Sequence, residues 1–257
     1  MSANHTALIT GASMGIGEEI ARSLASRTNH LILVARSEDK LKKLAERLGS
    51  EFGVQTTVIA MDLAAEGAAA KLYEQVADQP IDILVNNAGF GFKGAFLDLD
   101  LAGQQAMMHL NMVTLTEMCH LFGKAMVERG HGRILNVASV AAFQPGPKMA
   151  VYCASKAYVL SLSEALDAEL RGQGVTVTAL CPGAVDTNFH VVAKNETNKL
   201  LMSTAMAPRP VAEAGVRALF AGRRMVVPGL LNCVSVMTSR MMPRKASTRV
   251  TQKLIEG

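Results

Sequence analysis

Short apolar segments with the pattern of strands alternate with helix-like segments along most of the chain, and this alternation constrains the fold more than any other feature. Stretches such as 37–48 carry apolar residues three and four positions apart, at Leu41, Leu44 and Leu48, which is typical of amphipathic helices that cover a sheet. Repeated strand–helix–strand units connect with right-handed crossovers, so we expect a doubly wound α/β fold. The seven segments with the strand pattern are 6–10, 30–35, 55–61, 81–86, 132–137, 175–180 and 225–227.

No linker rich in Pro, Gly or Ser divides the chain, and no internal repeat recurs at a fixed period. A length of 257 residues is compatible with one α/β domain. The composition is 49% hydrophobic but only 4% aromatic, which suits an aliphatic core around a buried sheet. The sequence therefore predicts a single domain over residues 1–257, built on a seven-stranded, mostly parallel sheet with helices on both faces.

Several classes of protein are excluded by features that the sequence does not have. The first ten residues contain no basic segment followed by a long apolar run, and no apolar stretch reaches about 18 residues, so we predict a cytoplasmic protein. The six histidines show no metal-ligand spacing, so no metal site is predicted. The four cysteines form no C-x-x-C pair and are expected to be reduced thiols; they are Cys119, Cys153, Cys181 and Cys233.

Positive charge is concentrated in the C-terminal part of the chain. After Glu213 there are eight Lys or Arg residues and one acid, Glu256, so the first 213 residues sum to −3 from a total of +4 minus +7. Aromatic residues are not interleaved with these cations, so no nucleic-acid partner is predicted. Two interpretations of the basic, Met-rich extension at about 228–257 remain open: a helix packed on the domain with a solvated basic face, or weak contact with an anionic membrane or an acidic acyl carrier.

A glycine-rich turn follows the first predicted strand. The segment from Thr10 to Gly17 reads TGASMGIG, and a helix is expected to begin near Glu18. Glycine has no Cβ to block a pyrophosphate, and the N-terminus of a helix offers unpaired N–H groups and a partial positive charge to an anion. The turn therefore indicates a dinucleotide phosphate site, although a tight connection is the alternative for such a turn taken alone.

Arg36 occupies the end of the second predicted strand, where proteins that bind NAD usually carry an Asp or Glu for the ribose 2′-hydroxyl. An acid would repel the additional phosphate of NADP, whereas a guanidinium can bind it through two hydrogen bonds. Arg36 therefore favours NADP over NAD, with a solvated surface arginine as the alternative. Ser37 is expected to act as a helix N-cap.

Tyr152 and Lys156 are four residues apart in a predicted helix and so share one face. At about 5 Å and an effective dielectric constant near 20, an ammonium favours a phenolate by roughly 3 kcal/mol, or about two pKa units. The spacing therefore predicts a tyrosine that exchanges a proton near physiological pH. Alone, the pair is more typical of an ordinary helix contact, but Ser139 and the glycine turn accompany it.

Together these motifs resemble the short-chain dehydrogenase/reductase family from Thr6 to Phe189. The resemblance implies a Rossmann-type fold with Tyr152 as general acid or base and Lys156 lowering its pKa. It further implies that Ser139 hydrogen-bonds the substrate oxygen and that Asn111, in a helix, shapes a water relay behind Lys156. Many relatives have two serines where this chain has Ala138 and Ser139. The implied catalytic set is Asn111, Ser139, Tyr152 and Lys156.

The resemblance also implies which residues hold the cofactor. Asp62 would meet the adenine, Asn87 to Gly89 the middle of the cofactor, and Thr187 the carboxamide. The full set expected to bind NADP is Gly11, Ser13, Met14, Gly15, Ile16, Gly17, Arg36, Asp62, Leu63, Asn87, Ala88, Gly89, Tyr152, Lys156, Pro182, Gly183, Val185 and Thr187.

Beyond Thr187 the likeness weakens, and about 188–209 is expected to be a variable substrate lid. Phe90, Phe92, Met149 and Phe189 would give an apolar pocket, or form ordinary core packing. The sequence thus predicts an NADP(H)-dependent oxidoreductase that interconverts a carbonyl and a secondary alcohol on an apolar small molecule, assembled as a homodimer or homotetramer. The alternative is a catalytically idle NADP-binding sensor or interaction protein, but such a protein is expected to have lost Tyr152 or Lys156.

Overall fold

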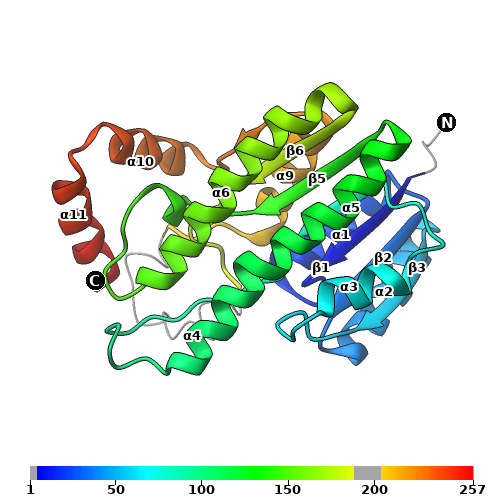
Figure 1. Ribbon diagram of the computed structural model, residues 1–257, viewed down its shortest axis with the longest axis horizontal. Helices are drawn as coiled ribbons and strands as arrows, with labels where there is room; N and C mark the ends of the chain where they lie inside the picture. Colours follow the sequence, from blue (N-terminus) through cyan, green and yellow to red (C-terminus); the bar gives the residue numbers. More distant parts are fainter. Residues whose placement is uncertain (1–4, 188–203, 257) are drawn as a thin grey trace.

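The seven predicted strands all form, and they lie side by side in one sheet (Figure 1). In this computed structural model, which describes residues 5–187 and 204–256, each neighbouring pair of strands is parallel. The strands are β1 (Thr6–Thr10), β2 (His30–Ala35), β3 (Gln55–Ala60), β4 (Ile83–Asn86), β5 (Gly132–Val137), β6 (Val175–Leu180) and β7 (Met225–Val226). Their order across the sheet is β3-β2-β1-β4-β5-β6-β7.

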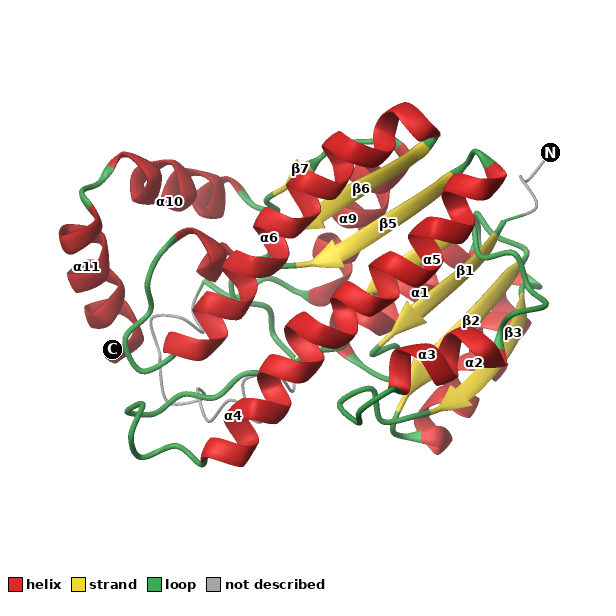
Figure 2. Cartoon of the chain, in the orientation of Figure 1, coloured by secondary structure: helices red, strands yellow, loops and turns green. Residues whose placement is uncertain are grey.

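Helices cover both faces of this sheet, as a doubly wound fold requires. One core contains the inward faces of α1 (Gly15–Ala25), α2 (Glu38–Phe52) and α9 (Pro208–Phe220), and the other contains those of α3 (Ala68–Gln75), α5 (Leu115–Arg129) and α6 (Ala150–Leu170). Figure 2 shows α5 and α6 lying across the strands on the near side. Successive residues of β1 alternate between the cores, with Ala7 and Ile9 in the first and Leu8 in the second. The strands are therefore apolar on both faces, and the sheet is buried.

The helix α2 shows how the sequence pattern produces one of these elements. Leu41, Leu44 and Leu48 are buried on the side that faces the sheet. The helix ends where Gly53 adopts a left-handed conformation (φ 68°) and donates its N–H to the carbonyl of Gly49. Ser37 occupies the N-cap position, as expected, but its hydroxyl makes no capping hydrogen bond. The helix continues about one turn beyond the predicted segment, through Gly49, and ends only at the left-handed Gly53.

The strand order reverses between β1 and β4, the position where ligands bind in open α/β sheets. All the loops that follow the carboxyl ends of the strands therefore lie along one edge of the sheet. This arrangement brings together the segments 11–17, 61–63, 86–89, 139 and 181–187, which are far apart in the sequence.

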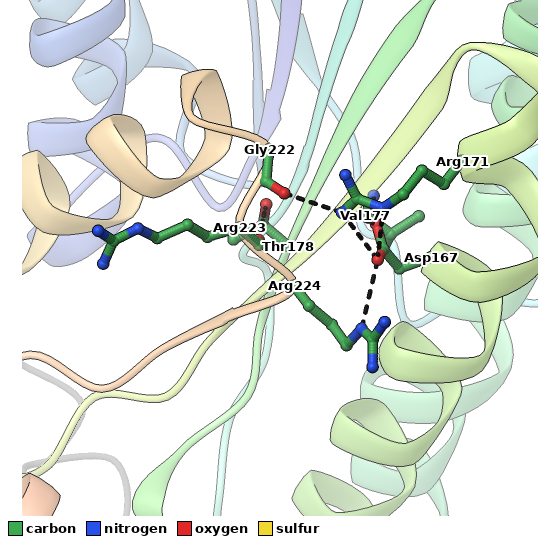
Figure 3. A network of polar contacts seen from close by, with 7 residues as sticks. All are labelled: Asp167, Arg171, Val177, Thr178, Gly222, Arg223 and Arg224. Atoms are coloured by element: carbon green, nitrogen blue, oxygen red, sulfur yellow. Dashed lines mark hydrogen bonds and ion pairs between the residues drawn. The ribbon is translucent and has the colours of Figure 1, made fainter.

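A buried carboxylate joins α6 to the opposite end of β6 (Figure 3). Asp167 is fully buried, and its Oδ1 accepts a hydrogen bond from the backbone N–H of Val177 at 3.0 Å. The Arg171 guanidinium donates to the same carboxylate at 2.8 Å and to the carbonyl of Gly222, also at 2.8 Å. Arg224 Nε lies 3.4 Å from Asp167 Oδ2. One side chain thus fixes the C-terminal end of α6 to β6 and to the segment that leads into β7.

The C-terminal extension forms two helices, α10 (Leu230–Met241) and α11 (Arg244–Glu256), beyond the carboxyl ends of β5 and β6 (Figure 1). The predicted lid at 188–209 lies mostly outside the described residues; in its described part, Met206 pairs with Val185 in an isolated parallel bridge. Across the described ranges, no helix has the length and apolar character needed to cross a membrane.

Candidate active site

The glycine turn lies between β1 and α1. Close contacts with neighbouring atoms explain why two of its positions, Gly11 and Gly17, must be glycine. Gly11 has a φ of 65°, and a Cβ there would lie 2.7 Å from Asn87 Nδ2. A Cβ on Gly17 would overlap the carbonyl oxygen of Gly11. The helix begins at Gly15 and not near Glu18, and Gly15 opens it with a left-handed φ of 62°. The N–H groups of Gly15 and Ile16 therefore belong to the open first turn of α1, where an anion binds.

Asn87 holds this turn against the strand β4. Its Nδ2 donates to the carbonyls of Thr10 at 3.0 Å and Gly11 at 3.1 Å, and its own backbone N–H donates to Thr10 Oγ1 at 3.0 Å. Ala88 N donates to the same hydroxyl at 3.0 Å. The predicted cofactor residue Asn87 is thus a rigid support for the predicted phosphate turn.

At the adenosine end of the predicted cofactor site, Arg36 and Asp62 follow β2 and β3. Both side chains are exposed, and Arg36 forms no ion pair with any described residue. Asp62 Oδ1 accepts the backbone N–H of Ala64 at 3.0 Å, so this carboxylate stabilises its own turn. The adjacent Leu63 is buried, and its carbonyl accepts a hydrogen bond from Thr114 Oγ1 at 2.9 Å.

Ser139, Tyr152 and Lys156 meet at the carboxyl end of β5. Each is buried, with 8%, 9% and 7% of its surface exposed. Ser139 hydrogen-bonds to Tyr152, and its Oγ also accepts the N–H of Ala141 at 3.1 Å. Lys156 Nζ donates to the carbonyl of Val137 at 2.7 Å and lies 5.9 Å from the centre of the Tyr152 ring. The structure therefore brings together three of the four side chains predicted to be catalytic.

The pKa of Tyr152 contradicts the expectation from the helical spacing. Burial raises this pKa above its ordinary value, and the hydrogen bond with Ser139 opposes the shift only in part. Burial also lowers the pKa of Lys156 to about 8. A lowered Tyr152 pKa would require a well-solvated pair, whereas both side chains are buried, and the cost of burying a charge is the largest cause of each shift. The Tyr152 phenol is therefore held in its protonated form at neutral pH.

Asn111, the fourth predicted residue, lies not in a regular α-helix but in a π-helical turn, η1 (His109–Thr114), which joins α4 (Leu101–Met108) to α5. Its Nδ2 donates to the carbonyl of Phe90 at 3.0 Å and to Ser155 Oγ at 3.1 Å, and Ser155 Oγ donates to the carbonyl of Tyr152 at 2.7 Å. Gly89 lies between Asn111 and Lys156, because a Cβ placed on it would be 2.9 Å from Asn111 Oδ1 and 3.7 Å from Lys156 Nζ. Asn111 thus borders the site and braces the helix that carries Tyr152. Single-turn π-helical insertions of this kind are frequent at functional sites.

The loop after β6 also borders the candidate site. Thr187 lies against the glycine turn, because a Cβ on Gly15 would be 3.0 Å from Thr187 Cγ2. The carbonyl of Pro182 accepts the backbone N–H of Val140 at 2.9 Å, which fixes this loop beside Ser139. Gly183 is covered by Asn232 of α10, whose amide occupies the space that a Cβ would need. Asn232 was not predicted as part of the site. The only feature of the sequence that pointed to a contact was its position just after the Pro-Gly turn at 228–229.

Tyr152 belongs to a small apolar cluster. Phe90 and Phe92 stack edge to face, with ring centres 5.5 Å apart. They pack beside Met107, Met149 and Cys153, so the expected apolar residues do gather here, apart from Phe189, which lies outside the described residues. Ile255 of α11 joins the same cluster, although nothing in the sequence pattern predicted that the C-terminal helix would reach it.

The sequence model of the short chain dehydrogenases matches residues 5–198, which is most of this chain. The chain belongs to the short-chain dehydrogenase family. It is an oxidoreductase that acts on CH–OH and C=O groups.

The alignments with individual relatives span most of this short-chain dehydrogenase. The ketoacyl reductase HetN of Nostoc sp. (strain PCC 7120) is 35% identical over 217 residues, which are 83% of this chain and 75% of HetN. The human very-long-chain 3-oxoacyl-CoA reductase is 34% identical over 197 residues, 75% of this chain but only 63% of the human protein. The solved structure of a short-chain dehydrogenase from Sphingobium yanoikuyae in complex with NADPH superposes with a TM-score of 0.84 and 33% identity over 92% of this chain and 93% of that one.

Proposed function

We propose that this short-chain dehydrogenase is an NADP(H)-dependent reductase that interconverts a carbonyl and a secondary alcohol on an apolar substrate. The observation that carries the proposal is the meeting of Ser139, Tyr152 and Lys156 beside the glycine turn, with Tyr152 in a small apolar cluster. The names of the relatives support it, since two are ketoacyl or oxoacyl reductases and a third was solved with NADPH.

The described residues fit a dinucleotide. A pyrophosphate needs close access to backbone N–H groups. Gly15 opens α1 with a left-handed φ of 62°, and the first N–H groups of that helix have no partner within it, so they can bind an anion. We infer that residues 11–17 hold the pyrophosphate, Arg36 the 2′-phosphate, and Thr187 with Lys156 the nicotinamide end. NADPH bound there would supply the hydride for reduction.

The proton comes from this chain's own residues. The Tyr152 hydroxyl is protonated at neutral pH because burial raises its pKa, and an acid is the form that can donate a proton to the carbonyl oxygen as that oxygen becomes an alkoxide. Ser139 Oγ, hydrogen-bonded to Tyr152, is placed to donate to the same oxygen. The pKa of Lys156, about 8, leaves most of its amine protonated at pH 7, so its charge favours the phenolate that remains after the transfer.

A panel of ketones and the matching secondary alcohols, assayed by NADPH absorbance, tests the proposal. We expect NADPH oxidation with bulky apolar ketones and 3-oxoacyl thioesters, and weaker activity with small polar ketones. If NADPH binds but no ketone in the panel is reduced, the protein is the idle NADP-binding alternative and the proposed reaction is wrong.

Replacing Arg36 by aspartate is expected to reverse the cofactor preference. With Arg36 present, NADPH should bind more tightly than NADH by about 1–3 kcal/mol, or roughly 5–150-fold, through a charge-assisted hydrogen bond to the 2′-phosphate. The carboxylate introduced by Arg36→Asp would repel that phosphate and accept hydrogen bonds from the ribose hydroxyls of NADH. Fluorescence titration of both cofactors measures the change, and Lys71→Asp, on the exposed surface of α3, is the matched control. Equal affinities in the unchanged protein would show that Arg36 is only a surface residue.

The proposal includes a homodimer or homotetramer in the cytoplasm. Val113 of η1 and Tyr158 of α6, which are 43% and 40% exposed, leave apolar surface where a second protomer would pack. All four cysteines are free thiols, which supports a reducing compartment.

A further inference from the structure

The helix α10 carries an apolar stripe on its outer side. Leu230, Val234, Met237 and Met241 are spaced four, three and four residues apart and are 81%, 54%, 65% and 84% exposed. That spacing places them on one face. Leu231 lies beside this face and is 75% exposed, whereas Val236 on the opposite side is buried. We call these five exposed residues the α10 stripe.

Exposed apolar side chains are concentrated in this part of the molecule. Of the thirteen large apolar residues that are exposed within the described ranges, seven belong to α10 and α11: the five of the α10 stripe, Val250 and Leu254. Single exposed apolar residues need no explanation, but a contiguous group of this size marks an interaction surface.

The neighbouring helix α11 presents a positively charged face. Arg244, Lys245, Arg249 and Lys253 are all exposed, and none of them forms an ion pair with a described residue. No acidic residue occurs in the sequence between Glu213 and Glu256. Among the described residues, no acidic side chain pairs with these charges on α11.

The inner side of α11 is attached to the body of the protein next to the catalytic residues. Ser247 and Thr251 are 4% and 3% exposed, and Ile255 packs in the apolar cluster around Tyr152. A Cβ on Gly146 would lie 3.4 Å from Ile255 Cδ1. This side of α11 is thus attached to the body of the protein. Both α10 and α11 lie beyond the carboxyl ends of β5 and β6, at the end of the molecule that holds the proposed active site (Figure 1).

We propose that α10 and α11 form a docking surface for an anionic lipid membrane. An interfacial helix buries an apolar face of Leu, Met and Val among the acyl chains, while nearby lysines and arginines meet the anionic headgroups. A second copy of this chain fits less well, because pairing the same surfaces about a two-fold axis would bring the unpaired cations of α11 from both protomers together. A small acidic protein would satisfy the cations but would leave the α10 stripe without a function. A lipophilic substrate would then be taken up at the membrane surface, beside the proposed active site.

Co-sedimentation of the purified full-length protein with vesicles tests this proposal without any substrate, so its outcome is separate from that of the proposed reaction. One set of vesicles contains phosphatidylcholine alone, and the other contains phosphatidylcholine with phosphatidylserine. We expect binding to the anionic vesicles at about 0.05 M salt, at least about tenfold less binding to the neutral ones, and loss of most binding at about 1 M salt, where the Debye length is about 3 Å.

The double variant Met237→Glu/Met241→Glu is expected to reduce binding to the anionic vesicles by at least about tenfold. Both side chains are exposed, so the fold and the activity on a soluble ketone should persist. The control, Lys71→Gln/Lys124→Gln, changes the net charge by the same −2 at exposed positions of α3 and α5 and should bind normally.

Three results would overturn the proposal. The first is no sedimentation with anionic vesicles at low salt. The second is equal binding by the two double variants. The third is a mass, measured by light scattering without lipid, that falls by half in Met237→Glu/Met241→Glu, since the α10 stripe would then be a contact between copies of this chain.

Discussion

Replacing Tyr152 by phenylalanine is expected to lower turnover by about 10²-fold or more, while affinity for NADPH changes little. The substitution removes only the hydroxyl, which is the sole group at this position able to give a proton to the substrate oxygen. The ring remains buried against Met149 and Cys153, so the pocket keeps its shape. Single-turnover reduction of a ketone with saturating NADPH measures the chemical step, and a fluorescence titration measures the affinity.

Tyr158→Phe provides the matched control for this prediction. Tyr158 lies on the same helix but is 40% exposed, and its hydroxyl bonds to Thr116 Oγ1 at 2.8 Å, away from Ser139. This variant should retain near-normal turnover. If Tyr152→Phe retained it as well, on a substrate whose chemical step limits the rate, another group would have to be the proton donor.

The sheet could be predicted from the sequence because its strands are short, apolar and separated by clear helical periodicity. All seven strand segments were identified within two residues at each end, since burial on both faces makes each one a continuous run, as in 30–35. Helix ends were less predictable. The start of α1 was placed three residues late because glycine has a low helix propensity, whereas Gly15 and Gly17 stand in its first turn because only glycine permits their close contacts with Thr187 and Gly11.

The members of the candidate site could be predicted, but its electrostatics and its outer wall could not. Ser139 follows the end of β5, and Tyr152 and Lys156 share one face of α6, as their four-residue spacing predicts. The hydrogen bond from Lys156 Nζ to the carbonyl of Val137 brings that face to the end of β5. The direction of the Tyr152 pKa shift depends on how deeply the ring is buried, and helical spacing contains no information about depth. The contacts of Asn232 with Gly183 and of Ile255 with the Tyr152 cluster join segments 49 and about 100 residues apart, and no local pattern encodes them.

Replacing Asp167 by alanine is expected to destabilise the protein by about 1–3 kcal/mol, the usual cost of leaving a buried donor without an acceptor. The Arg171 side chain is 44% exposed, so water can solvate its charge after the change. The change leaves the buried N–H of Val177 without an acceptor and removes the carboxylate that the Arg171 guanidinium binds (Figure 3). The free energy of unfolding, measured from urea transitions with an unchanged slope, would report the loss.

Two further variants divide this effect between hydrogen bonding and charge. Asp167→Asn keeps an oxygen that can accept the Val177 N–H, so it should cost less than Asp167→Ala, because a buried donor without an acceptor costs about 1–3 kcal/mol. Arg224→Ala should cost no more than about 1 kcal/mol, since its side chain is 57% exposed and its contact with Asp167 is 3.4 Å long.

A loss of stability below about 1 kcal/mol for Asp167→Ala would mean that packing alone, and not this carboxylate, holds α6 against β6. The network lies at the opposite end of β6 from Ser139 and Tyr152, so all three variants should still bind NADPH at temperatures where they are folded.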